Sequence, residues 1–201
     1  MRLLTAVSGF LSAALLSAFG GPTLSSAVFA PESRYTDLVG RSCQTEPVGG
    51  DLGAGAEQTK RCPGLGGAKV VVTADHSQVA LGYEWSAREK ADEVLAHWSL
   101  GYKLEWRGFQ TSRGFDPYAT VIRVLFNSGA EPADRPVLAV MRVRRGEACV
   151  MAVVDIASNP DAYELARQLA DSRALGFVCG RDAARVEGIP TARATQLLAG
   201  L

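Results

Sequence analysis

An apolar N-terminal segment followed by four widely spaced cysteines constrains the fold of this chain more than any other feature of its sequence. Arg2 precedes an apolar run over residues 3–19, and small residues follow that run. This arrangement is typical of a secretory signal peptide. All the cysteines lie beyond the apolar segment: Cys43, Cys62, Cys149 and Cys179. Because disulfides persist in oxidising compartments, the sequence predicts an exported, disulfide-linked protein.

The end of the apolar segment offers two cleavage sites with small residues at the required positions. One follows Ala27 and the other follows Ala30, which precedes Pro31. We expect cleavage after Ala27, because a proline just beyond the cut hinders a protease that binds extended backbone. The alternative is an uncleaved anchor, but the run is shorter than the roughly 20 residues that span a bilayer. Residues 1–27 are therefore predicted to be a signal peptide, which leaves a periplasmic or secreted protein without stable membrane insertion.

The part of the chain that follows is long enough to bury a core of its own. About 170 residues remain after cleavage, and a chain of that length buries about 70% of its unfolded surface. We predict one domain over residues 28–180. Residues 181–201, where the hydrophobic pattern weakens, are predicted to form a C-terminal tail with a short helix over residues 192–198.

The charge balance argues against nucleic-acid binding. The full chain has 21 basic and 21 acidic residues, and losing Arg2 leaves 20 against 21, a net charge of −1. A protein that binds phosphate backbones normally has a basic excess. The one basic cluster lies at an apparent hairpin turn, which we interpret as solvated: Arg142, Arg144 and Arg145. No nucleic-acid partner is expected.

Four cysteines allow three pairings, and the sequence does not select one of them directly. Sequential pairing closes the two smallest loops, so we favour Cys43–Cys62 and Cys149–Cys179. The rival interpretation is a metal site, but the sequence has no C-x-x-C or H-x-x-x-H spacing. We expect neither a metal nor a cofactor.

Most of the chain has the alternating or continuous apolar pattern of β-strands. Residues 33–38 predict a first short strand or a turn, and six further segments show the strand pattern: residues 69–72, 78–83, 103–107, 119–126, 137–143 and 148–156. Residues 69–72 and 78–83 flank a turn-prone cluster and predict a hairpin. The strongest hairpin signal is the pair 137–143 and 148–156. These two runs have so little polar alternation that we expect their strands to be covered on both faces.

Two segments have helical spacing instead. Residues 86–100 repeat apolar side chains every three or four positions, and Ser86 can cap them with a glutamate three residues on. In the second segment Asn159 can cap a helix that ends near Gly176. Residues 45–67 are rich in glycine and predict a surface loop. The predicted fold is α+β: an antiparallel β-meander sheet of about six strands, packed by one or two helices and stapled by two disulfides.

The sequence contains no recognisable catalytic motif. No G-x-S-x-G, H-E-x-x-H or Walker sequence is present. His76 lies between Asp75 and Ser77, but neighbours in one tight turn rarely converge as a triad. His97 lies on the predicted helix of residues 86–100 with no obvious nucleophile. No catalytic residue is assigned, and a hydrolase or transferase that uses His97 or His76 as its base remains the alternative.

One polar cluster is a candidate binding site. Alternation places Glu105 and Arg107 on one face of a strand, and Arg123 lies on the polar side of the next strand. These three side chains could simply form cross-strand ion pairs. They could also bind a ligand, since two guanidiniums exceed one carboxylate by one charge and guanidiniums bind carboxylates and phosphates well.

Six segments of the chain carry a resemblance to known sequences: Ser33-Arg34-Tyr35-Thr36-Asp37-Leu38, Cys62-Pro63-Gly64, Leu104-Glu105-Trp106-Arg107, Pro117-Tyr118-Ala119-Thr120, Asn159-Pro160-Asp161 with Glu164-Leu165-Ala166, and Phe177-Val178-Cys179-Gly180. Together they resemble a family of uncharacterised secreted or periplasmic proteins of Gram-negative bacteria. The resemblance covers most of the chain after the signal peptide. It implies export and a single domain, and it implies no activity.

The function that these observations favour is binding without catalysis. We expect an exported, non-enzymatic module that binds an envelope component, another protein or a small ligand. The expectation rests on the lack of a catalytic motif, a metal spacing or a cofactor loop. A compact disulfide-linked β-domain is also a common scaffold for presenting binding loops, although a fold alone does not define a function.

Overall fold

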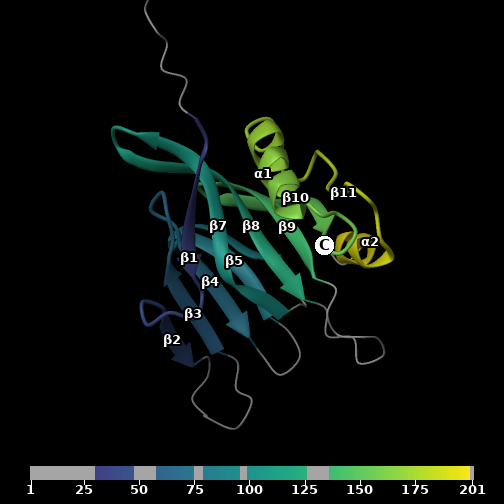
Figure 1. Ribbon diagram of the computed structural model, residues 1–201. Helices are drawn as coiled ribbons and strands as arrows, with labels where there is room; N and C mark the ends of the chain where they lie inside the picture. Colours follow the sequence, from purple (N-terminus) through teal and green to yellow (C-terminus); the bar gives the residue numbers. More distant parts are fainter. Residues whose placement is uncertain (1–29, 48–57, 75–78, 96–98, 126–135, 200–201) are drawn as a thin grey trace, which may run out of the picture.

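The computed structural model describes residues 30–47, 58–74, 79–95, 99–125 and 136–199, which form two β-sheets and two helices (Figure 1). The six-stranded sheet contains, in spatial order, β1 (Glu32–Asp37), β7 (Ser99–Thr111), β8 (Gly114–Leu125), β9 (Val137–Arg144), β10 (Glu147–Asp155) and β11 (Arg185–Glu187). The five-stranded sheet contains β2 (Gln44–Pro47), β3 (Gln58–Pro63), β4 (Lys69–Ala74), β5 (Val79–Ser86) and β6 (Glu89–Leu95). The helices are α1 (Ala162–Arg173) and α2 (Ala192–Ala199). The fold is broadly α+β, with strand predominating.

The strands do not form the single antiparallel meander that the sequence predicts. After β1 the chain builds the whole five-stranded sheet before it returns to pair β7 with β1. In addition, β11 runs parallel to β10, with α1 in the connection between them. The apolar pattern of a strand shows that it is buried, but it does not show which of two sheets it joins. The sequence therefore predicts strands without predicting their division into two sheets.

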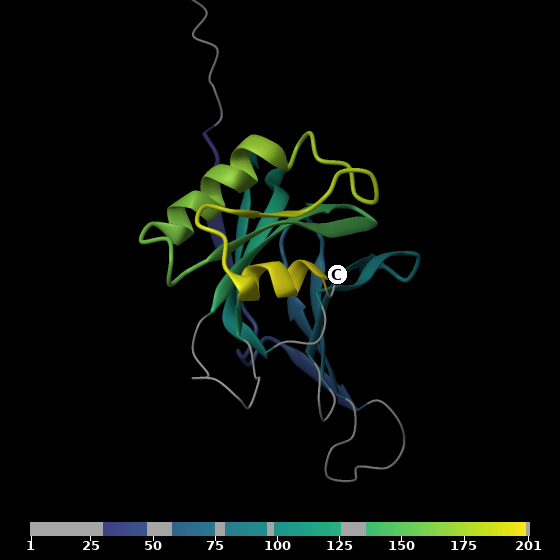
Figure 2. The same cartoon turned by 90° about the vertical axis from the view of Figure 1, so that its right-hand side faces the viewer.

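The five-stranded sheet lies on one face of the six-stranded sheet and α1 on the other (Figures 1 and 2). The six-stranded sheet therefore separates two cores. Its inner face packs on the five-stranded sheet through fully buried side chains such as Trp106, Ile122 and Tyr83. Its outer face packs on α1, where Val121 lies in one core with small helix residues such as Ala166. Because side chains alternate along a strand, Val121 and Ile122 enter different cores. The layer order is therefore helix, six-stranded sheet, five-stranded sheet.

Both predicted hairpins are present. Strands β4 and β5 pair antiparallel, and so do β9 and β10. Every residue of β9 is buried except Arg144, which confirms that this strand is covered on both faces. Gly146 has φ +75° in the β9–β10 turn, a conformation that glycine adopts without steric cost. The predicted strands at 33–38, 103–107 and 119–126 are confirmed over their described residues as β1 and parts of β7 and β8.

The predicted helix over residues 86–100 is wrong. Strands β5 and β6 form a hairpin there, and β7 begins at Ser99. The Ser86 hydroxyl accepts a hydrogen bond from the Glu89 backbone N–H at 3.2 Å and donates one to the Glu89 carboxylate at 3.1 Å. The first of these contacts is the one expected of a helix cap, but here it closes a tight turn between strands. A local pattern of this kind is compatible with both structures, and pairing with β5 decides between them.

The predicted loop over residues 45–67 is also wrong in part. Strands β2 and β3 pair within it, while residues 48–57 lie outside the described residues. The disulfide Cys43–Cys62 links the connection after β1 to β3, with its Cα atoms 4.1 Å apart. Cys149–Cys179 links β10 to the segment after α1, with Cα atoms 5.8 Å apart. Both predicted pairings are therefore confirmed.

Asn159 does not cap α1. The helix begins at Ala162, and Asp161 stands at its cap position without a side-chain hydrogen bond. The buried Asn159 amide instead donates to the Asp155 carbonyl and accepts from the Ile189 N–H, both at 2.8 Å. Its side chain thus joins the end of β10 to the chain just after β11.

The residues expected as a C-terminal tail complete the fold. Strand β11 pairs with β10, and α2, which matches the predicted helix over 192–198, packs against β10 and β11. Ala194 is fully buried and belongs to the core between the sheets. In the described part of the chain, neither helix has the length and apolar character needed to cross a bilayer.

Candidate functional site

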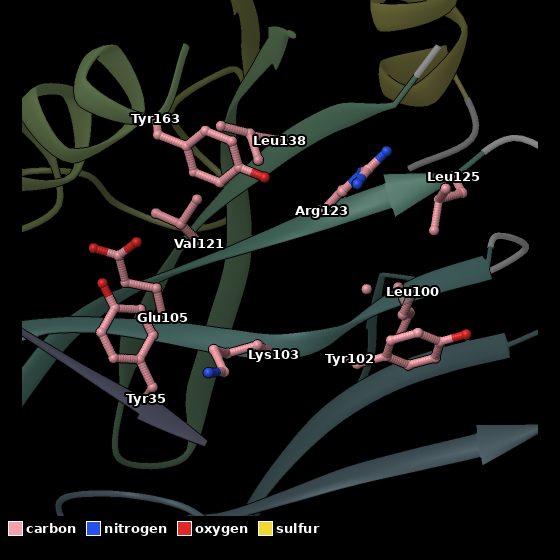
Figure 3. A pocket seen from close by; sticks show the side chains of 11 residues that line it. Tyr35, Leu100, Tyr102, Lys103, Glu105, Val121, Arg123, Leu125, Leu138 and Tyr163 are labelled. Atoms are coloured by element: carbon pink, nitrogen blue, oxygen red, sulfur yellow. The ribbon is translucent and has the colours of Figure 1, made fainter. Parts of the chain in front are cut away.

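The outer face of the six-stranded sheet has a hollow of about 390 Å³ beside α1 (Figure 3), here called the outer trough. Apolar side chains of β7, β8 and β9 line it: Leu100, Val121, Leu125 and Leu138. Three exposed tyrosines stand around them: Tyr35 from β1, Tyr102 from β7 and Tyr163 from α1. Gly101 and three charged residues complete the lining: Lys103, Glu105 and Arg123. The volume is at the small end of the range for ligand pockets.

Arg123 is exposed in the outer trough, on the strand that also contributes Val121 and Leu125. Among the described residues, none forms a hydrogen bond or ion pair with its guanidinium. Lys103, the other cation of the trough, lies 3.7 Å from the Asp37 carboxylate and over the Tyr35 ring. Arg123 is therefore the cation of this hollow with donor groups available for a ligand.

Glu105 and Arg107 lie on the same sheet face as Arg123, as predicted, but both are buried and occupied. The Glu105 carboxylate accepts from Arg167 of α1 at 2.7 and 3.3 Å and from the Ser33 hydroxyl. Arg107 donates to both carboxylate oxygens of Asp171 at 2.9 and 2.6 Å. The predicted cluster of Glu105, Arg107 and Arg123 therefore does not form, because partners from α1 satisfy the first two.

The contacts to α1 change the proton affinities of the groups involved. Hydrogen bonding to Glu105 raises the pKa of Arg167, and hydrogen bonding to Asp171 raises the pKa of Arg107. Tyr118 donates its hydroxyl to Asp171 at 2.6 Å. Burial, followed by the hydrogen bond to the Asp171 carboxylate, raises the pKa of Tyr118. Both guanidiniums stay charged, so these pairs fix α1 in place and with it the wall of the trough.

Sequence reasoning missed Arg167 and Asp171, although a signal was present. The two residues are four positions apart on α1, so they lie on the same helix face. They lie next in sequence to Ala166 and Ala170, which are fully buried against the sheet. Charged side chains that border a buried alanine stripe are placed to contact the strands beneath. The missing information was which strands those are.

The candidate catalytic residues cannot be placed in this site. His76, with Asp75 and Ser77, and His97 lie outside the described residues. Within the described part of the chain, no group of three or more histidine, cysteine or acidic side chains could hold a metal ion.

A second polar region, near the end of α1, differs from the outer trough in its charge pairing. This cleft of about 560 Å³ contains Arg173, Arg181 and Arg185. Each of these lies within 4.0 Å of a carboxylate, either Glu187 or Asp182. The cleft therefore lacks an unoccupied cation like Arg123.

The arginines predicted to lie in a solvated turn are also paired. Arg144 and Arg145 are exposed and bind Glu147 and Glu89. Arg142 is buried, contrary to the prediction, because it donates to the Ala174 carbonyl at 3.1 Å and to Glu147 at 2.9 Å. This group therefore links β9 to neighbouring elements and offers no binding site.

Comparison of the chain with protein-family models, with curated proteins and with solved structures finds no match. The outer trough is distinguished by its geometry: an apolar lining, tyrosine side chains around it and one available guanidinium.

Proposed function

We propose that this chain is an exported, non-enzymatic binding protein whose site is the outer trough. Its ligand has an apolar body and one anionic group. Two disulfides among the described residues support export, because such bonds persist in oxidising compartments. The resemblance to secreted proteins of Gram-negative bacteria supports the same location.

The observation that carries this proposal is the Arg123 guanidinium, which has no partner among the described residues and lies beside an apolar surface. A guanidinium binds carboxylate, sulfonate or phosphate groups through paired, charge-assisted hydrogen bonds. The leucine and valine side chains of the trough contribute by removing apolar ligand surface from water. The three tyrosines add rings that are apolar over most of their area and polar at one end.

The test uses 1-anilinonaphthalene-8-sulfonate, a fluorescent molecule with an apolar body and one sulfonate. We expect the folded protein to bind it, and Arg123→Ala to weaken binding about 10- to 100-fold, the usual effect of losing a hydrogen bond to a charged group. Stability should change by no more than about 1 kcal/mol, because the side chain is exposed. Cooperative thermal unfolding of each variant shows whether the dye is reporting the folded state.

The matched control is Arg113→Ala, which removes an exposed arginine from the β7–β8 turn, at the other end of these strands. It should leave dye binding unchanged. Uncharged 1-anilinonaphthalene should bind the wild type more weakly than the sulfonate does. Its affinity should be the same for the wild type and for Arg123→Ala. Unchanged sulfonate binding by Arg123→Ala, together with a clear loss of stability, would remove the outer trough from consideration as an anion site.

A further inference from the structure

A second apolar hollow lies at the open end between the two sheets. It has a volume of about 320 Å³ and is here called the end crevice. Its lining includes Leu38, Val39, Val72 and Val79. Val72 packs against the core between the sheets, and Val39 is 60% exposed at the rim. The end crevice is therefore an opening of the inner core toward solvent.

The end crevice and the outer trough meet at an irregularity in β7. Leu100 is opposite Val124, whereas Leu104 is opposite Ile122, so β7 has more residues than β8 over this stretch. The extra residues form a bulge, which changes the direction in which side chains point. Four residues of this region line both hollows: Leu100, Gly101, Tyr102 and Leu125. Tyr102 is 74% exposed and lies beside Leu100, another residue that lines both hollows (Figure 3).

Gly101 brings the two strands close together at this point. A Cβ atom on Gly101 would lie 3.1 Å from the Arg123 Cβ and 3.2 Å from the Arg123 carbonyl oxygen. The lack of a side chain at Gly101 keeps the surface beside Arg123 open toward Leu100 and Leu125. Arg123 therefore lies beside the residues that line both hollows, and from there an apolar surface leads past Tyr102 into the crevice.

We propose that the ligand is a fatty acid, a single-chain carboxylate. This inference rests on the proposed function and names the ligand class of the same site. The carboxylate binds Arg123, and the alkyl chain passes Leu100 and Tyr102 to end against Val39 in the end crevice. One available guanidinium in the trough matches one carboxylate charge. Two small hollows of about 390 and 320 Å³ that share lining residues suit one chain better than the paired chains of a phospholipid.

The test is a series of saturated carboxylates with 8, 10, 12 and 14 carbons, titrated calorimetrically below their micelle-forming concentrations. Each added methylene that is buried should tighten binding about fourfold, from about 0.8 kcal/mol per methylene. Arg123→Ala should weaken binding of every length by a similar factor. Dodecanol, which has the same chain and no charge, should bind wild type more weakly than dodecanoate.

Val39→Asp tests the path of the chain. It places a charge at an exposed rim position of the end crevice. It should therefore abolish the gain in affinity that the longest chains bring and leave octanoate binding unchanged. The matched control is Leu175→Asp, which changes a 64% exposed apolar residue beyond α1. The Leu175→Asp variant should keep the full increase in affinity with chain length.

The outcomes separate this inference from the proposed function. If octanoate binds in an Arg123-dependent way but Val39→Asp keeps the full gain with chain length, the fatty-acid path is wrong and the binding function stands. If neither the dye nor any carboxylate binds, both the proposed binding function and the fatty-acid inference are wrong. Lys60 also lines the end crevice, so binding lost in Lys60→Ala and retained in Arg123→Ala would overturn the assigned orientation. Capture by phosphatidylglycerol vesicles, without binding of single-chain carboxylates, would overturn the ligand class.

Discussion

At the scale of single residues, ion pairs act together with apolar packing to position α1. The buried residues of the helix are alanines, Ala162, Ala166 and Ala170, which lets it lie close to the sheet, and Leu165 and Leu169 pack partly buried against the same core. Arg167 and Asp171 add ion pairs to Glu105 and Arg107. The placement of the helix therefore depends on a few charged atoms as well as on apolar packing.

We expect Asp171→Ala to destabilise the protein by about 2–4 kcal/mol. The change leaves the Arg107 side chain, which is 10% exposed, without its carboxylate partner, and it also removes the acceptor of Tyr118. Urea unfolding at pH 7 measures the loss. The control is Glu164→Ala on the same helix, whose side chain is 59% exposed and lies 3.7 Å from Arg167. It should cost less than about 1 kcal/mol. Equal losses in both variants would show that the Asp171 contacts are not specific.

The buried tyrosines predict a loss of stability at alkaline pH. Burial raises the pKa of Tyr83 and of Tyr118, and the Asp171 carboxylate raises that of Tyr118 further. In the unfolded chain tyrosine ionises near pH 10. A pKa that is higher in the folded state gives stability that is fully present below about pH 10 and is lost as the pH rises above it.

The urea concentration at the unfolding midpoint should therefore decrease as the pH is raised from 9 to about 11.5. The decrease should be less steep in Tyr118→Phe. Tyr102→Phe serves as control, because it removes an exposed phenol and leaves both buried ones in place. Parallel pH profiles for wild type and Tyr118→Phe would show that Tyr118 does not contribute.

At the scale of elements, the sequence predicts the secondary structure of those segments whose apolar pattern is compatible with only one type of element. The β9–β10 hairpin is found because two continuous apolar runs flank a turn containing Gly146. The prediction for residues 86–100 is wrong because their apolar spacing fits either a helix or a hairpin, and the Ser86–Glu89 contacts are compatible with both. The sequence does not predict strands β2 and β3, because glycines lie between them and neither has a regular apolar pattern. In each failure the deciding contact is with a neighbouring strand, which a local pattern does not reveal.

The same reasoning applies to the candidate site. Alternation correctly places Glu105, Arg107 and Arg123 on one face of the sheet. It does not show that α1 covers the first two and leaves the third open, since the register of a helix over a sheet depends on packing between distant segments. Arg123 could be singled out from sequence only as one charge of three.

The connection between β10 and β11 gives a prediction at this scale. Gly188 has φ +81°, and a Cβ atom there would collide with the side-chain oxygen of Asn159. We expect Gly188→Ala to lower the melting temperature more than Gly67→Ala. Gly67 has a similar φ of +78°, but a Cβ atom there would meet no other atom within 4 Å.

Asn159→Ala should cost about 1–3 kcal/mol, because it removes hydrogen bonds from both backbone groups that the amide satisfies. Chemical denaturation provides the measurement. A neutral effect of Asn159→Ala, with Gly188→Ala no worse than Gly67→Ala, would contradict a role for this contact in docking β11.

At the scale of the whole molecule, covalent links reinforce contacts between segments that are distant in sequence. Cys149–Cys179 joins a strand of the six-stranded sheet to the chain beyond α1, and Cys43–Cys62 joins the segment after β1 to the other sheet. We expect loss of Cys149–Cys179, by replacing both cysteines with serine, to cost about 2–5 kcal/mol.

The paired replacement of Cys43 and Cys62 should cost less, because Cys149–Cys179 fixes a buried strand relative to its packing helix. Equilibrium unfolding in urea, without reductant, compares the two double variants. The reverse order of stability would show that linking the sheets near β1 matters more than fixing α1.

The Cys43–Cys62 bond also changes what a protease can do to this molecule. The bond closes a ring of backbone that includes β2, and β1 and β4 leave the ring at its two ends. One peptide bond cut anywhere inside that ring produces a second pair of chain ends but no second molecule. The nicked protein keeps its mass, apart from one added water, and separates into two pieces only after reduction. In a compartment that contains proteases and oxidants together, a single cleavage there leaves both sheets covalently connected.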